Sequence, residues 1–383
     1  MIAAGALLLA VPSSARLGSH LPDNAQPSVS VGFQHACGLD AEGRALCWGP
    51  NSEGEVGDGT DSVRAAPVRV AGNQTFTSIA AGHRHTCAVT AEGQAYCWGS
   101  NTTGALGDGT RALKRTPIAV GGSLAFRSIS LGGRHTCGVT RSGEAYCWGS
   151  NGVGEIGDGT RTTRTQPTRV AGGLTFTAIT AGLDHSCGLV ADGSAYCWGS
   201  NDFGELGDGE QTDAVDQPTR VGGPLSRYTK LSAGSGRTCG VARDGAAYCW
   251  GNNQVGTLGN GKDSLRVVPT RVVGGLQFES LALGSSHACG LTRAGEAHCW
   301  GYNAYGQFGD GTRTARMVPT KVSGTQTFRS ITAGGFRTCA VTANGETYCW
   351  GQTFGTRLGE PPATGATLTP TRIGDMTFRA QKQ

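Results

Sequence analysis

The tryptophans of this chain recur at a fixed interval, and this regularity restricts the possible folds more than any other feature. All seven lie in a Cys-Trp-Gly tripeptide, 50 residues apart except for one interval of 52, at Trp48, Trp98, Trp148, Trp198, Trp250, Trp300 and Trp350. A repeat of about 40 to 50 residues is typical of proteins in which each repeat forms one supersecondary unit and packs on its neighbours. The sequence therefore predicts seven copies of one unit.

Each unit has the pattern of four short β-strands. In the second unit, apolar alternation with a period of two is interrupted by Gly and Asp-Gly, which predicts strands at 78–81, 86–90, 94–98 and 117–120. We call them strands A to D. Four-stranded units repeated around an axis form a propeller, so we predict an all-β, seven-bladed β-propeller over residues 28–379. Residues 376–379 align with the segment before strand A, and we expect them to complete the first unit.

Two cysteines ten positions apart occur in every unit. The segment 91–93, Ala-Glu-Gly, is typical of a three-residue hairpin loop, and counting back from it places Cys87 opposite Cys97 in a non-hydrogen-bonded pair. Cα atoms lie about 4.5 Å apart in such a pair, close enough for a disulfide. The same count predicts seven bridges: Cys37–Cys47, Cys87–Cys97, Cys137–Cys147, Cys187–Cys197, Cys239–Cys249, Cys289–Cys299 and Cys339–Cys349.

A metal site is the alternative use of these cysteines, because His85 could share a strand face with Cys87 and Cys97. In the fifth and seventh units Arg237 and Arg337 replace this histidine, so we favour disulfides and expect neither metal nor cofactor. Disulfides persist in oxidising compartments. This indicates a secreted, periplasmic or cell-envelope protein.

The first fifteen residues resemble a signal peptide. An apolar run at 2–11 precedes Pro-Ser-Ser-Ala at 12–15, and the run is too short to span a bilayer. No basic residue precedes Arg16, so the usual positive start is missing. We predict a signal peptide at 1–15, a disordered leader at 16–27, a tail at 380–383 and no membrane span.

The motifs Gly-x-x-His-Thr/Ser/Ala-Cys, Gly-x-x-Tyr-Cys-Trp-Gly and Asn-x-x-Gly-x-Leu-Gly-Asp-Gly-Thr resemble the regulator-of-chromosome-condensation repeat, seven times over about residues 28–379. With paired cysteines in each repeat, the chain is similar to secreted bacterial members. The resemblance implies a propeller but no single function, because the family includes nucleotide-exchange factors, photoreceptors, ligase adaptors and secreted inhibitors.

Several of those functions fit poorly. Uniform repeats leave no room for an inserted exchange-factor wedge, and disulfides disagree with a nuclear location. The photoreceptor's extra tryptophans are missing, because all seven tryptophans belong to Cys-Trp-Gly. A net charge of +4 is too small for a nucleic-acid stripe.

The A–B and C–D connections should share one face, where the residues after the strand-A glycine differ between units. We expect these residues to surround the mouth of the central channel, and aromatic and Arg side chains are typical of protein interfaces. The predicted partner-binding residues are Phe33, Gln34, His83, Arg84, Arg134, Leu183, Asp184, Tyr302, Phe336, Arg337 and Phe354. We expect a sector from blades 6, 7 and 1 to dominate. The sequence thus predicts a monomeric recognition or scaffold protein that binds an unknown protein partner and not nucleic acid.

An extracellular hydrolase or lyase is the alternative, with His83, Arg84, Arg134 and Asp184 at the channel mouth. No nucleophile elbow, zinc-protease or P-loop motif occurs.

Two sets of polar residues that recur in most units have structural interpretations. We expect hydrogen bonds to a neighbouring loop from His35, His85, His135, His185 and His287, and turns closed by Asp58, Asp108, Asp158, Asp208 and Asp310.

Overall fold

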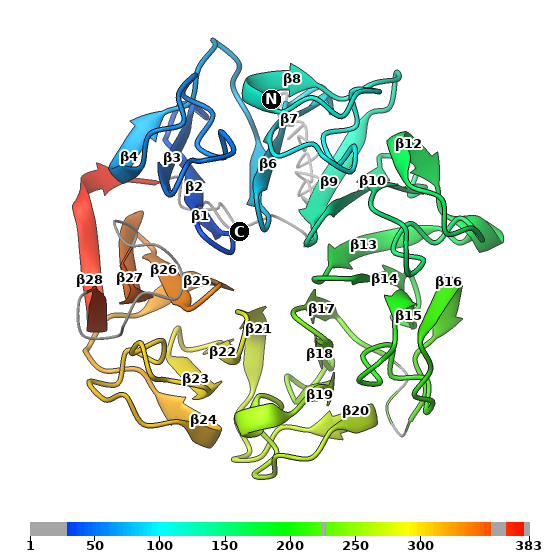
Figure 1. Ribbon diagram of the computed structural model, residues 1–383. Coiled ribbons are helices and arrows are strands. Elements are labelled where there is room, and N and C mark those ends of the chain that lie inside the picture. Colours follow the sequence, from blue (N-terminus) through cyan, green and yellow to red (C-terminus); the bar gives the residue numbers. More distant parts are fainter. Residues whose placement is uncertain (1–28, 224, 226, 354–364, 379–383) are drawn as a thin grey trace, which may run out of the picture.

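The described residues form a ring of seven four-stranded antiparallel sheets around a central axis (Figure 1). The computed structural model describes residues 29–353, except 224 and 226, and residues 365–378. The predicted signal peptide, leader and tail, and Phe354, lie outside the described residues. The seven-bladed all-β propeller predicted from the repeat is confirmed.

The strands of each blade follow one another from the axis outward. Blades 1 to 4 contain β1–β4 (Val29–Val31, Ala36–Leu39, Ala45–Gly49, Arg64–Arg69), β5–β8 (Ser78–Ala81, His85–Val89, Ala95–Gly99, Lys114–Ala119), β9–β12 (Phe126–Leu131, His135–Thr140, Ala145–Gly149, Arg164–Arg169) and β13–β16 (Phe176–Ala181, His185–Val190, Ala195–Ser200, Ala214–Arg220). Blades 5 to 7 contain β17–β20 (Lys230–Ala233, Arg237–Val241, Ala247–Gly251, Arg266–Arg271), β21–β24 (Phe278–Leu283, His287–Thr292, Ala297–Gly301, Arg316–Lys321) and β25–β28 (Phe328–Gly334, Arg337–Thr342, Glu346–Gln352, Ala366–Thr377). Two short 3₁₀ turns, η1 (Ala171–Gly173) and η2 (Gln254–Gly256), are the helical elements of the described residues.

The predicted strands of the second unit agree with blade 2 to within one residue except at strand D. This strand, β8, begins at Lys114, three residues before the predicted start at Pro117. Strand D lies at the outer edge of the blade, where a proline is tolerated because one side of the strand needs no partner. The proline therefore does not mark the beginning of the strand.

All seven predicted disulfides are confirmed. Each joins directly opposed residues of strands B and C, with Cα atoms 4.0 to 4.1 Å apart. In blade 2 the loop before strand C has Gly93 at a φ of 93°, and Thr90 donates its backbone N–H to Gln94 at 3.0 Å. These two features fix the register that brings Cys87 to Cys97.

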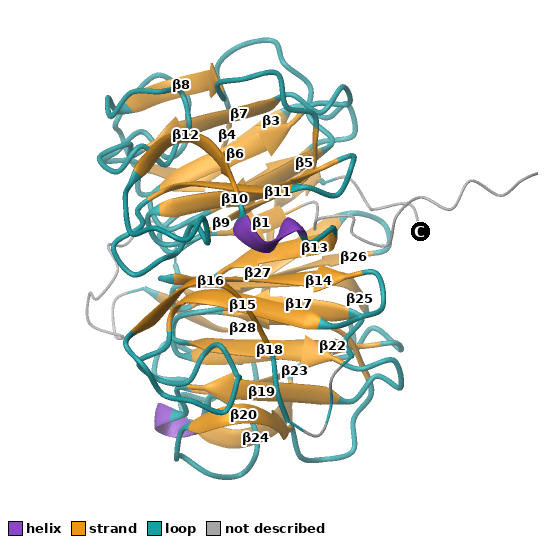
Figure 2. Cartoon of the chain, turned by 90° about the vertical axis from the view of Figure 1, so that its right-hand side faces the viewer, coloured by secondary structure: helices purple, strands orange, loops and turns teal. Residues whose placement is uncertain are grey.

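The hydrophobic core lies between the blades, at contacts that we call seams. Each seam buries the tryptophan of one blade against the preceding blade, as Trp148 packs with Leu106 and Phe126. The last seam closes the ring, because Phe378, just after β28, packs on Trp48 of blade 1 with ring centroids 5.7 Å apart. Viewed from the side, the strands run between two faces covered by loops (Figure 2). No helix of the described residues is long and apolar enough to cross a membrane.

Candidate functional site

The A–B turns and C–D loops share one face, which we call the loop face. On the axis a cavity of about 140 Å³ is lined by the first residue of each A–B turn: Phe33, His83, Gly133, Leu183, Ser235, Ser285 and Gly335. Backbone hydrogen bonds join neighbouring turns, from Phe33 to Gly82 at 3.1 Å and from Ser285 to Gly335 at 2.9 Å. Such bonds join the turns at five of the seven junctions, and the pair of residues after the strand-A glycine differs from blade to blade.

At five of the seven seams a hydrogen-bond chain beneath the A–B turn crosses to the next blade. At the first seam, His35 Nε2 lies 2.7 Å from Thr86 Oγ1, which itself donates to the carbonyl of Glu55 at 2.8 Å. Because that hydroxyl hydrogen is already used, the imidazole donates from Nε2. Trp98 Nε1 donates to the same carbonyl at 2.9 Å. The histidine therefore bonds to a hydroxyl group on strand B of the next blade. The prediction of a direct hydrogen bond to a neighbouring loop was wrong.

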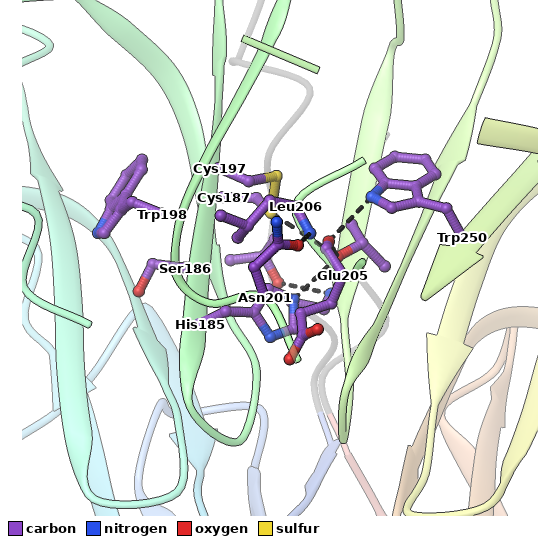
Figure 3. The surroundings of a disulfide bond; sticks show 12 residues. His185, Ser186, Cys187, Cys197, Trp198, Asn201, Glu205, Leu206 and Trp250 are labelled. Carbon is purple, nitrogen blue, oxygen red and sulfur yellow. Dashed lines mark hydrogen bonds between the residues drawn. A yellow bond between two sulfur atoms is a disulfide. The ribbon is translucent and has the colours of Figure 1, made fainter. Parts of the chain in front are cut away.

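The same arrangement recurs at the seam of blades 4 and 5 (Figure 3). Trp250 Nε1 donates to the Glu205 carbonyl at 2.9 Å, and His185 Nε2 lies 2.8 Å from Thr238 Oγ1. Burial lowers the pKa of His185 to about 3. These histidines are neutral structural groups at physiological pH.

Two seams use arginine in place of histidine, and at both the next blade offers alanine in place of the hydroxyl. Arg237 faces blade 6, which has Ala288 at this position, and donates to the carbonyls of Gly284 at 2.6 Å, Ser285 at 2.8 Å and His287 at 2.9 Å. Burial lowers its pKa to about 10, so the guanidinium stays charged at neutral pH.

Arg337 occupies the corresponding position at the seam of blades 7 and 1, opposite Ala36. Its guanidinium donates to the carbonyls of Gln352 at 2.8 Å, Thr353 at 2.8 Å and Gln34 at 3.0 Å. The side chain is fully buried. Arg337 was predicted to contact a partner, but the structure places it inside the seam, where it cannot reach one.

The other aromatic residues predicted for the sector of blades 6, 7 and 1 form two separate groups. Phe33 stacks on His83 of blade 2, with ring centroids 3.9 Å apart. Phe336 instead stacks on Tyr305 at 4.8 Å and lies 5.9 Å from Tyr302. The structure brings Tyr302 and Phe336 together but directs Phe33 toward blade 2.

The charged candidates lie on blades 2, 3 and 4. Arg84 lies 3.7 Å from the Glu53 carboxylate of blade 1, and Arg134 is exposed. Burial and the neighbouring charge of Glu155 raise the pKa of Asp184, whereas Arg134 lowers it. Leu183, beside Asp184, is exposed, and Gln34 is half-buried.

A buried carboxyl group in blade 1 was not recognised from the sequence. Glu55 is fully buried, and its Oε1 has no hydrogen-bond partner in the described structure. In blades 3 and 4 a serine hydroxyl donates to the equivalent glutamate, as from Ser150 to Glu155 at 2.7 Å. Blade 1 has Pro50 at the serine position, and burial raises the pKa of Glu55 to about 7. Pro50 is the sequence feature that could have indicated that the carboxyl group of Glu55 lacks the serine partner.

The Asp-Gly loops are closed by their own aspartates, as predicted. Asp58 accepts hydrogen bonds from the backbone N–H of Thr60 at 3.0 Å and from Arg64 Nε at 2.6 Å. Within the described residues, no cluster of three His, Cys, Asp or Glu side chains could hold a metal ion.

Sequence profiles of known families match most of the chain. The RCC1-like domain matches residues 10–282, and the Regulator of chromosome condensation (RCC1) repeat matches residues 278–307 and 294–341. The chain belongs to the RCC1-like family. The comparison with curated proteins gave no match.

Solved structures share the fold of this RCC1-like propeller at low sequence identity. Prp20p from Saccharomyces cerevisiae, described for its binding to Gsp1p and histones, is 24% identical with a TM-score of 0.74 over 88% of this chain and 87% of its own. Human WBSCR16 is 21% identical with a TM-score of 0.77, over 86% and 94%. The ectodomain of the Arabidopsis thaliana receptor kinase ACR4 is 19% identical with a TM-score of 0.55, over 89% and 98%. At these identities the likeness establishes the fold alone.

Proposed function

We propose that this RCC1-like propeller is a secreted or cell-envelope recognition protein that binds a partner protein through the loop face. The observation that carries the proposal is the ring of A–B turns. A shared backbone, hydrogen-bonded between turns at five of the seven junctions, presents a different residue pair on each blade around one channel mouth, which is how rigid scaffolds display binding residues.

Two further observations support the proposal. Seven disulfides fit an oxidising compartment. Binding to Gsp1p and histones is described for Prp20p, and Kap60 is described bound to the same yeast protein, so a protein with this fold binds several protein partners. With Arg337 buried, we assign the contact surface to Phe33, Gln34, His83, Arg84, Arg134, Leu183, Asp184, Tyr302 and Phe336.

The enzyme alternative has weaker support from the geometry. His83 is stacked on Phe33. Burial and the charges of Arg84 and Arg134 lower its pKa to about 4. The charged groups acting on His83 are thus cations, while the carboxyl of Asp184 lies two blades away. We therefore favour binding over hydrolysis.

Affinity capture from the native extracellular fraction, with captured proteins quantified by mass spectrometry, tests the proposal. The double variant Arg84→Glu/Tyr302→Ala should lose a partner that the unmodified protein captures. The control Arg243→Glu alters an exposed residue of a B–C turn on the opposite face and should retain it. Equal capture by all three proteins would refute the loop face as the binding surface.

A further inference from the structure

A small cavity lies at the seam of blades 5 and 6, away from the loop face. Its volume is about 70 Å³, and its walls include Lys230, Ser232, Cys239 and Val241 of blade 5 and Leu281 of blade 6. Lys230 begins strand A and Val241 ends strand B, so the cavity lies toward the face of the B–C turns. A water molecule takes about 30 Å³ in the liquid. The cavity therefore has room for about two waters or for one small ligand.

Lys230 differs from the residues that hold the same register in other blades. Five other blades have a serine or an alanine there: Ser78, Ser128, Ala178, Ser280 and Ser330. Lys230 is half-buried, and its ammonium group makes no salt bridge and no hydrogen bond within the described residues. Burial of a charged group is costly unless an opposite charge or a hydrogen-bond partner accompanies it. The lysine thus adds an unpaired positive charge at a position that is neutral in those blades.

Ser232 brings a second polar group without a partner to this cavity. It lies opposite the first cysteine of its blade. At four other seams a hydroxyl in this register accepts a backbone N–H of the next blade, 3.0 to 3.2 Å away: Ser30, Ser130, Thr180 and Thr332. The hydroxyl of Ser232 makes no hydrogen bond in the part of the chain that the structure describes. It is therefore free to donate to a ligand.

The other walls of the cavity are apolar. Val241 is buried, and Leu281 packs on the core cluster of this seam, which includes Cys239. Cys239 is used in its disulfide with Cys249. A ligand that matches all the walls has one anionic group for Lys230 and Ser232 and a small apolar part for Val241 and Leu281. A phosphate group would bring nearly two negative charges to one cation and has no apolar part, so a carboxylate fits better.

We propose that the Lys230 cavity, defined as Lys230, Ser232, Val241 and Leu281, binds a short-chain carboxylate such as acetate. The ammonium group of Lys230 and the hydroxyl of Ser232 donate to the carboxylate, and the apolar end of the ligand contacts Val241 and Leu281. Charge-assisted hydrogen bonds of this kind are stronger than neutral ones. The cavity lies away from the loop face, so this inference goes beyond the proposed function and does not depend on it.

An NMR titration of the full chain, with labelled Leu and Val methyl groups, tests the site. Acetate added at constant ionic strength should shift the methyl signals of Leu281 and Val241 to saturation, with a dissociation constant of about 10 mM. Acetamide has the same shape without the charge and should bind about tenfold more weakly. Lys230→Met should weaken acetate binding about tenfold, and Ser232→Ala should weaken it less. The matched control Lys262→Met removes an exposed lysine from the C–D loop of the same blade and should leave binding unchanged.

Three results would overturn the inference. Methyl signals that do not shift to saturation would mean that the cavity holds only water. Equal affinities for acetate and acetamide, or an unchanged acetate affinity of Lys230→Met, would mean that the ammonium group extends into solvent and holds no anion. Unchanged thermal midpoints of the variants exclude a loss of the fold. Arg84→Glu/Tyr302→Ala should bind acetate as the unmodified protein does, so a failure of this inference leaves the proposed function standing.

Discussion

The seams of this propeller are of two kinds, which differ by one residue on each side. Five seams join a histidine to a hydroxyl of the next blade, in the pairs His35–Thr86, His85–Thr136, His135–Ser186, His185–Thr238 and His287–Thr338. Two have an arginine opposite Ala288 or Ala36, and this arginine donates to main-chain carbonyls. Arginine occurs wherever the next blade lacks the hydroxyl. The first residue of strand B is therefore matched to the neighbouring blade and not to its own.

The physical reason is hydrogen-bond satisfaction in the core. A histidine facing Ala288 would leave its buried Nε2–H without an acceptor, which costs about 1 to 3 kcal/mol. Arginine extends past the alanine and donates to several carbonyls at once. The guanidinium of Arg237 remains charged without a carboxylate, because three carbonyl dipoles of the next blade accept from it.

A fall in pH should destabilise the histidine seams but not the arginine seams, and this is the largest difference that we expect between them. Burial lowers the pKa of His35, His85, His185 and His287 to about 3, while the unfolded value is 6.5. Their stabilising contribution is complete above pH 6.5 and is lost as the pH falls toward 3, by about 1.4 kcal/mol per pH unit for each histidine. Neither seam arginine changes its charge in this range. Urea unfolding at pH 7, 6 and 5 should show that the free energy of unfolding falls steeply with pH. The variant His85→Gln removes one of the titrating histidines, so its free energy of unfolding should fall less steeply, by the contribution of that histidine. An unchanged slope would contradict the neutral buried imidazole.

Exchanging one kind of seam for the other tests the pairing rule directly. Arg237→His should destabilise the protein by about 3 kcal/mol, because it leaves carbonyls and an imidazole N–H unpaired. Adding Ala288→Thr should recover more than half of that lost free energy of unfolding. The double variant has one more buried histidine than the unmodified protein, so its free energy of unfolding should fall more steeply between pH 7 and pH 5. A double-mutant cycle from urea midpoints at pH 7 measures the coupling. Strictly additive effects would show that the two positions are matched by chance.

The sequence predicted the repeat-determined features well, and failed where side chains act between repeats. Ring size follows from the number of units, and strand order and disulfide pairing follow from patterns inside one unit, such as the loop that aligns Cys87 with Cys97. Arg337 was misplaced on the surface because its partners are main-chain carbonyls, those of Gln352 and Thr353 in its own blade and that of Gln34 in blade 1, and sequence periodicity does not display such contacts. For the same reason Phe33 was assigned to the aromatic group of Phe336, although it stacks across a seam on His83. The loop-face binding residues remain predictions.

Disulfides act within blades, so their removal should not distinguish the two kinds of seam. Cys87→Ala/Cys97→Ala in blade 2 should cost about 2 to 3 kcal/mol, the value for a loop of this size. Cys289→Ala/Cys299→Ala in blade 6, which adjoins an arginine seam, should cost the same. Unfolding at pH 7 without reductant compares them. A clearly larger cost in blade 6 would mean that the arginine seam depends on the rigidity of its blade.

The smallest expected effect concerns Glu55. Its pH dependence has the opposite sign to that of the histidines, because its contribution to stability is lost as the pH rises. Its folded pKa of about 7 lies above the ordinary 4.5, so its contribution is complete below pH 4.5 and is lost as the pH rises through 7. Glu55→Gln, which copies Gln307 of blade 6, should therefore stabilise the protein by about 1 to 2 kcal/mol at pH 8 and much less at pH 5. Pro50→Ser would supply the hydroxyl found in blades 3 and 4 and should give a similar gain. Equal stabilisation by Glu55→Gln at both pH values would show that packing, and not the buried charge, distinguishes blade 1.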